Sequence, residues 1–97
     1  NKIYEIENLH TVPKLRAIML GKNQIEKIKN LNWLLDLEVL DLHSNKIKII
    51  ENLSMLKKLR LLNLANNQIT GFSELINNKN LEEINLRKNL VIDFLII

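Results

Sequence analysis

The sequence contains no cysteine and no apolar run long enough to cross a membrane as a helix. Its longest apolar run, residues 90–97, is interrupted by Asp93, whereas a membrane-spanning helix needs roughly 20 apolar residues. A chain without cysteine forms no disulfide bonds, which favours a reducing compartment. We therefore expect an intracellular protein, cytoplasmic, cytoskeletal or nuclear, that does not insert into a membrane.

Residue types that build catalytic or metal sites are also scarce. The two glycines, Gly21 and Gly71, are too few for a glycine-rich phosphate loop. The two histidines, His10 and His43, lack the spacing of metal ligands. Asp41 and His43 share one face of an expected strand, but such a pair without a nucleophile is not an active site. The sequence therefore predicts no enzyme, no cofactor and no metal.

Charge of one sign is not concentrated anywhere in the chain. The formal net charge is +3, and Lys and Glu are interleaved, so no basic run predicts nucleic-acid binding. Only 4% of the residues are aromatic although 46% are hydrophobic, so leucine and isoleucine carry the core. This composition favours many small, equivalent layers over one large irregular core.

What the chain has instead is a strict period of 22 residues. The asparagines with this period are Asn1, Asn23, Asn45, Asn67 and Asn89. The leucines with this period are Leu15, Leu37, Leu59 and Leu81, and also Leu20, Leu42, Leu64 and Leu86. A fixed period of this length, built on leucines and one asparagine, predicts a leucine-rich repeat solenoid of the α/β class.

Each repeat divides into two halves with different spacing. The first half, L-x-x-L-x-L-x-x-N, alternates apolar and variable residues, which predicts one short strand per repeat in a curved parallel sheet on the concave face. The second half has apolar residues three apart, as in Ile25, Ile28 and Leu31, which predicts short 3₁₀ or α turns on the convex face. We expect the asparagines Asn23, Asn45, Asn67 and Asn89 to form a structural ladder that satisfies backbone groups of the turns.

The repeats form one array over residues 1–97. We expect a partial repeat at 1–14, full repeats at 15–36, 37–58 and 59–80, and a truncated repeat at 81–97. The chain begins with Asn and both ends fall within repeats, so we expect a fragment of a longer protein. Without capping repeats, we expect Ile3 and Ile6, and at the other end Val91, Phe94 and Ile97, to face outward and to promote self-association.

The third repeat departs from the pattern. Gly71 and Phe72 interrupt the expected spacing, and Asn78 stands in the column of Leu34 and Leu56. We expect local irregularity between Gly71 and Lys79.

A narrower pattern, N-x-I-x-x-I-E-N-L, occurs at Asn1–Leu9 and Asn45–Leu53 and nearly at Asn23–Leu31. It resembles the 22-residue repeat class typified by the nuclear regulatory subunit of protein phosphatase 1, which also occurs in ciliary, centrosomal and splicing proteins. A finer resemblance, to the leucine-rich-repeat subunit of the tubulin polyglutamylase complex, lies in residues 20–23, 39–43 and 62–65. The class implies a concave strand face that binds a protein, such as a phosphatase or a cytoskeletal or ciliary complex.

The outward strand positions are the candidate binding residues. Ala17, Met19, Val39 and Leu61 form an apolar patch that folding does not require, and such patches mark protein interfaces. The expected polar rim is Glu38, Asp41, His43, Asn63 and Arg87. The alternative is that small aliphatic residues simply favour strands.

Two other surface features deserve separate interpretations. The alternating column Arg16, Glu38, Arg60 and Glu82 is expected to pair across neighbouring strands and to contribute little to stability. Trp33 and Met55 form a second candidate contact surface on the convex side, and the alternative is a Trp33 ring folded beside Leu35.

Three hypotheses of function remain open. The first is a protein-binding module or scaffold that acts through the concave patch. The second is a structural spacer in a multidomain protein, which has no dedicated ligand. The third, and the least favoured, is an RNA-associated role like that of the splicing proteins, which predicts salt-sensitive binding.

Overall fold

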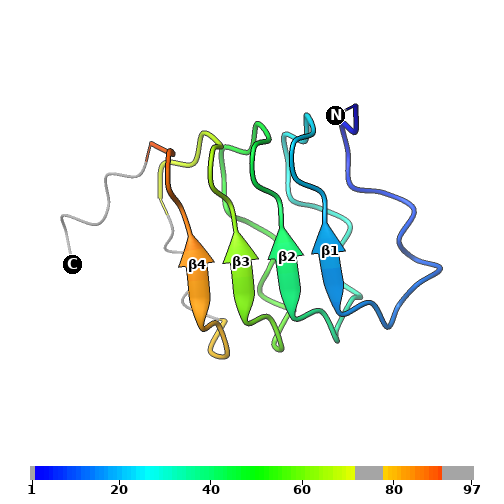
Figure 1. Ribbon diagram of the computed structural model, residues 1–97. Helices are drawn as coiled ribbons and strands as arrows, with labels where there is room; N and C mark the ends of the chain where they lie inside the picture. The colour runs from blue at the N-terminus through cyan, green and yellow to red at the C-terminus, as the bar shows by residue number, and fades with distance from the viewer. Residues whose placement is uncertain (1, 72–77, 91–97) are drawn as a thin grey trace.

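A computed structural model describes residues 2–71 and 78–90 of the chain. Its four strands pair in parallel in the order of the sequence (Figure 1). They are β1 (Ala17–Met19), β2 (Val39–Asp41), β3 (Leu61–Asn63) and β4 (Glu83–Asn85). Their first residues are 22 positions apart, so the predicted strand of each repeat is confirmed.

The register places equivalent positions of successive repeats side by side. Ile18 pairs with Leu40, and Leu40 pairs with Leu62, and all three side chains are buried. Backbone bonds continue beyond the strands, as where the Leu20 amide donates to the Asp41 carbonyl at 2.9 Å. Each apolar layer therefore packs between copies of itself, which is why the period must be kept without slips.

The core is a set of such columns behind the sheet. Its leucines include Leu37, Leu40, Leu42, Leu59, Leu62 and Leu64, and its isoleucines include Ile25, Ile28, Ile47, Ile50 and Ile69. No aromatic residue belongs to the core cluster of the described residues, in keeping with the composition.

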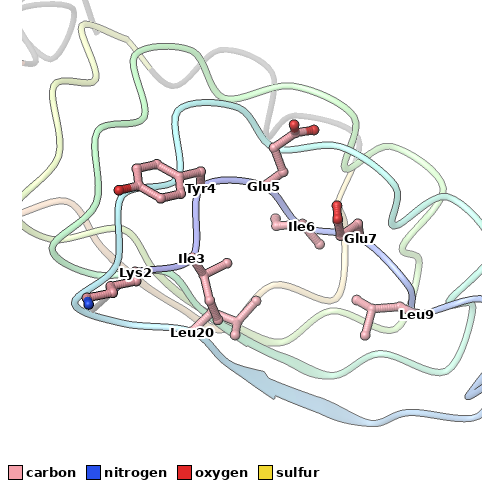
Figure 2. A pocket seen from close by; sticks show the side chains of 8 residues that line it. All are labelled: Lys2, Ile3, Tyr4, Glu5, Ile6, Glu7, Leu9 and Leu20. Atoms are coloured by element: carbon pink, nitrogen blue, oxygen red, sulfur yellow. The ribbon is translucent and has the colours of Figure 1, made fainter.

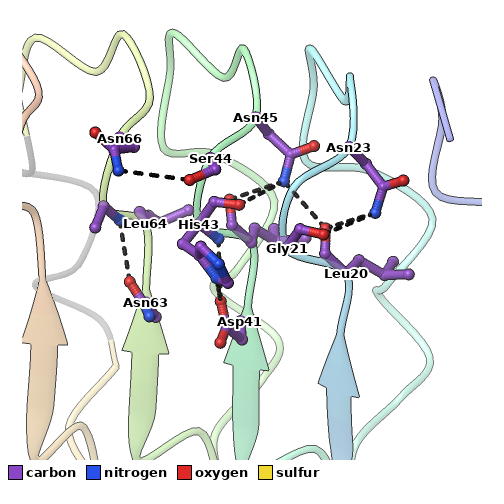
Figure 3. Close-up of polar contacts among 12 residues, drawn as sticks. Leu20, Gly21, Asn23, Asp41, His43, Ser44, Asn45, Asn63, Leu64 and Asn66 are labelled. Carbon is purple, nitrogen blue, oxygen red and sulfur yellow. Dashed lines mark hydrogen bonds and ion pairs between the residues drawn. The ribbon is translucent and has the colours of Figure 1, made fainter. Parts of the chain in front are cut away.

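The asparagine ladder is confirmed at the ends of the strands (Figure 3). Asn45 donates to the carbonyls of Leu42 at 2.9 Å and, in the preceding repeat, of Leu20 at 3.1 Å. Its Oδ1 accepts the amide of Ile25 at 2.9 Å. Asn67 repeats these bonds one layer further along and is likewise buried. Each ladder asparagine therefore closes its own turn and fastens it to the repeat before.

The described residues contain no helix, so the 3₁₀ or α turns predicted for the convex face, and with them the helical part of the predicted α/β class, are not seen there. The turns there have single bonds three residues apart, as from the Leu34 amide to Leu31 and from the Leu37 amide to Leu34. Upstream, the amide of Ile25 donates to Asn45 in the next repeat. The backbone itself also leaves the helical region, because Asn30 and Asn52 have positive φ, which a right-handed helix does not contain.

Among residues 2–71 and 78–90, seven residues other than glycine have positive φ, and they fall in two columns. One column contains Lys22, Ser44, Asn66 and Lys88, with φ between 57° and 60°. The other contains Asn8, Asn30 and Asn52, with φ of 62° to 63°. Asparagine tolerates the left-handed region better than lysine or serine, so in the first column Lys22, Ser44 and Lys88 are more strained than Asn66.

Of the two isoleucines that were predicted to face outward at the N-terminal end, only one does. Ile3 is 41% exposed, but Ile6 is only 1% exposed, because it packs into the core cluster. Together with Leu9 and Leu20, these side chains line a hollow of about 490 Å³ at this end of the array (Figure 2). Val91, Phe94 and Ile97 lie outside the described residues, as does most of the stretch expected to be irregular.

Asn78 was expected to interrupt the column of Leu34 and Leu56, but its side chain is accommodated there. It is buried, and its amide donates to the carbonyls of Leu53 at 2.8 Å and Leu56 at 3.3 Å. The polar side chain therefore takes the place of a leucine by bonding to the backbone of the preceding repeat.

Candidate functional site

The outward side chains of the four strands form one surface, here called the strand face, which corresponds to the predicted concave face. Its residues are Ala17, Met19, Val39, Asp41, Leu61, Asn63, Glu83 and Asn85. The register aligns Ala17, Val39 and Leu61 in one row across three strands. Met19, in the adjoining row, is 66% exposed. The four predicted patch residues therefore lie side by side.

The strand face contains a hollow of about 230 Å³ between the patch and β4. The outward side chains that line it are Met19, Val39, Asp41, Leu61, Asn63, Glu83 and Asn85. Glu83 and Asn85 were not among the predicted site residues, although they share rows with Leu61 and Asn63. The 22-residue register was the signal that could have found them. The predicted rim residues Glu38, His43 and Arg87 do not line the hollow.

The polar row of the strand face has a structural role that the sequence reasoning missed. In each of three repeats, the side-chain oxygen accepts the backbone amide two residues further along. The pairs are Asp41 with His43 at 3.0 Å, Asn63 with Ala65 at 3.1 Å and Asn85 with Arg87 at 3.1 Å. These bonds fix the side chains and determine which of their polar atoms remain available.

His43 lies across Gly21, on the repeat before it (Figure 3). Its Nδ1 lies within hydrogen-bonding distance of Oδ1 of Asp41, at 2.6 Å. A Cβ atom at position 21 would come within 2.1 Å of the imidazole Cε1. Glycine at this position therefore leaves the space that the ring occupies.

The charged column beside the patch pairs across the strands as predicted. Glu38 contacts Arg16 at 2.8 Å and Arg60 at 3.5 Å, and Arg60 contacts Glu82 at 3.8 Å. The hydrogen bond from Arg16, and the charges of Arg16 and Arg60, lower the pKa of Glu38 despite the opposing effect of desolvation. Glu38 is therefore held between two arginines rather than free for a partner.

The second candidate surface stays exposed. Trp33 is 44% exposed, Met55 is 52% exposed and Leu35 is 52% exposed. These residues lie on the turns that connect the strands.

Within residues 2–71 and 78–90, no group of three or more His, Cys, Asp or Glu side chains is arranged to hold a metal. No helix in the same part of the chain is suited to crossing a membrane.

Comparison with known proteins agrees with this architecture. Residues 36–77 match the family described as leucine-rich repeats in two copies. The solved structure of internalin C2 of Listeria monocytogenes is similar, with a TM-score of 0.82 and 32% identity over 88% of this chain. The chain has the fold of leucine-rich repeat proteins. Another internalin of that organism matches with a TM-score of 0.75 and 32% identity over 79% of this chain.

The matched region covers only part of each relative. It spans 38% of internalin C2 and 23% of the other internalin. A search of the curated proteins gave no match. The resemblances to the phosphatase and polyglutamylase subunits therefore stay predictions.

Proposed function

We propose that this chain is a non-enzymatic recognition module that binds a partner protein through its strand face. The observation that carries the proposal is the apolar patch, which lies across three neighbouring strands on the side opposite the core. Its most prominent member, Met19, is 66% exposed and has no role in the core cluster. An apolar patch with a polar border is the usual character of a protein interface.

The size of the patch suits a small binding hot spot. Complete burial of a Met, Val or Leu side chain contributes about 1.5–3 kcal/mol. Val39 and Leu61 are already half-buried, so their further burial contributes less than the full amount. A few such anchors typically dominate the free energy of association.

The kind of partner comes from the resemblance stated above. We propose an intracellular partner, either a phosphatase catalytic subunit or a subunit of a cytoskeletal or ciliary complex. We also propose a contact with a second copy of the chain at the hollow that Ile3 lines.

Two alternatives make different predictions. A structural spacer tolerates charges anywhere on the strand face. An RNA-binding surface would show binding that weakens steeply with salt, but Glu38, Asp41 and Glu83 place negative charge on or beside the strand face.

The test is affinity capture from a lysate of the source cells, read by mass spectrometry. The wild type is compared with Met19→Glu/Leu61→Glu and with the matched variant Trp33→Glu/Met55→Glu, which puts the same charges on the turns. Circular dichroism establishes that each variant is folded. We expect a partner that the strand-face variant loses and the turn variant keeps.

The opposite pattern would move the binding site to Trp33 and Met55. Capture profiles that are the same for all three proteins would favour the spacer.

A further inference from the structure

The hollow on the strand face differs in charge from the chain as a whole. The chain has a net charge of +3, yet the side chains that line the hollow include Asp41 and Glu83 and no lysine or arginine. Met19, Val39 and Leu61 form its apolar side. An occupant that fits it must therefore combine an apolar group with a positive charge.

Glu83 is the carboxylate that is available for such a charge. It is exposed and has no ion pair within the described ranges, whereas its neighbour Glu82 pairs with Arg60 at 3.8 Å. Asp41 adds a second negative charge to the hollow, although one of its oxygens is held by His43. The arginines of the charged column, Arg16 and Arg60, contact Glu38 and Glu82 rather than Glu83.

Asn63 and Asn85 supply hydrogen-bond donors of fixed direction. Each uses its Oδ1 to accept a backbone amide, at 3.1 Å in both cases. In the part of the chain that the structure describes, neither Nδ2 has a hydrogen-bond acceptor. Two amide donors beside an apolar hollow suit the carbonyl oxygens of an extended backbone.

We infer that, if the strand face binds a protein as proposed above, its hollow receives an extended segment of the partner with an apolar residue followed or preceded two positions away by lysine or arginine. The apolar side chain packs among Met19, Val39 and Leu61, and the cation reaches Glu83. Backbone carbonyls of the segment accept hydrogen bonds from Asn63 and Asn85.

The spacing of two follows from strand geometry. Leu61 and Glu83 are register partners on adjacent strands, and adjacent strands lie about 4.8 Å apart. The centre of the patch, between Val39 and Leu61, is therefore roughly 7 Å from Glu83. Side chains two residues apart in an extended segment project to the same side and are separated by roughly 6.7 Å.

The test is selection from a phage-displayed library of random linear peptides on the immobilised full chain. Selection is repeated on Glu83→Lys, on Glu26→Lys and on Met19→Glu/Leu61→Glu. Glu26 is exposed and does not line the hollow, so its variant controls for the same change in net charge. Affinities of the enriched peptides are then measured by fluorescence anisotropy with the wild type, Glu83→Gln and Glu83→Lys.

We expect the wild type and Glu26→Lys to enrich peptides that carry Lys or Arg two positions from Leu, Ile, Val or Met. Glu83→Gln should weaken their binding about three- to tenfold, as expected for loss of one charge pair at a partly exposed interface. Glu83→Lys should abolish the preference for basic residues, and the double variant should enrich nothing.

Two results would overturn the inference and leave the proposed function standing. One is enrichment that depends on Met19 and Leu61 but has no basic preference. The other is no enrichment by the wild type while lysate capture still yields a partner that depends on the patch. Peptides that bind the double variant as well as the wild type would instead argue against the strand face as the binding site.

Discussion

The asparagine ladder and the strand face occupy the same repeats, yet one repeats itself and the other does not. Asn45 and Asn67 are identical because each bonds to the same backbone groups of its own turn and of the repeat before. On the strand face, the row that begins with Ala17 continues as Val39 and Leu61 and ends in Glu83. Positions whose neighbours are copies of themselves are held constant by packing and hydrogen bonding. Positions that face away from the array are free to differ, and there a binding surface can form.

The largest effect should come from breaking a repeated column. Leu42 is fully buried between equivalent leucines, so Leu42→Ala leaves a cavity that neighbouring repeats have little freedom to fill. We expect a loss of about 2–5 kcal/mol in the free energy of unfolding. Urea denaturation followed by circular dichroism measures it. A loss below 1 kcal/mol would mean that the layers adjust far more than this packing allows.

Asparagine occurs both in the ladder and in the polar row of the strand face, so alanine variants at the two places compare their contributions to stability directly. Asn45→Ala leaves the buried Ile25 amide without its acceptor and removes the bonds to the carbonyls of Leu20 and Leu42, which keep a second donor from a neighbouring ladder asparagine. We expect a loss of about 2–4 kcal/mol. Asn63→Ala removes one hydrogen bond, to the half-buried Ala65, and should cost about 0.5–1.5 kcal/mol. Equal losses in the same urea assay would contradict the distinction between the two columns.

A smaller effect is expected where the His43 ring lies over the backbone of the preceding repeat. Gly21→Ala forces the His43 ring away and disturbs its hydrogen bond with Asp41. We expect a loss of about 1–2 kcal/mol. In a double-mutant cycle, His43→Ala should remove most of that cost, since the space is then empty. Additive losses would show that the ring does not cause the strain.

The ion pairs of Glu38 in the charged column should make stability depend on pH in the acidic range. The pKa of Glu38 is lowered in the folded state, so its contribution is present above about pH 4.5, the ordinary value for glutamate. That contribution is lost as the pH falls through the lowered pKa. Thermal unfolding between pH 6 and pH 3 should show Tm falling less steeply for Glu38→Gln than for the wild type. High salt should reduce the difference, because these groups are exposed to solvent.

The smallest effect concerns backbone strain. Lys22 has a φ of 60°, and the equivalent position two repeats later is Asn66, which tolerates that region better. Lys22→Asn should therefore raise the free energy of unfolding by about 0.5–1 kcal/mol. The control is Lys46→Asn, which changes an exposed lysine that does not have positive φ. Equal effects of the two variants would assign the gain to charge rather than to strain.

Features that follow from the 22-residue period could be predicted from the sequence. Features that depend on contacts between residues of different columns could not. The strands, the asparagine ladder and the pairing of Glu38 follow from spacing alone. The turns of the convex side do not, because apolar residues three apart fit either a helix or an extended chain whose amides bond to the next repeat. Two contacts between repeats could not be predicted from the spacing of the sequence. They are the His43 ring over Gly21 and the bonds that hold Asn78 in a column of leucines.

The candidate site shows the same division. Its apolar patch was predictable because Ala17, Val39 and Leu61 share one row. The hollow could not be predicted in this way. It is formed where the row of Ala17, Val39 and Leu61 reaches Glu83 on β4 and the polar row reaches Asn85.

The most direct test of the central claim combines binding and stability in one variant, Met19→Glu/Leu61→Glu. We expect its free energy of unfolding to stay within about 1 kcal/mol of the wild type, as for changes outside the core. The amount of partner captured from lysate should fall to background. Retention of the partner by the folded variant would contradict the account, because the strand face would then carry neither the fold nor the binding.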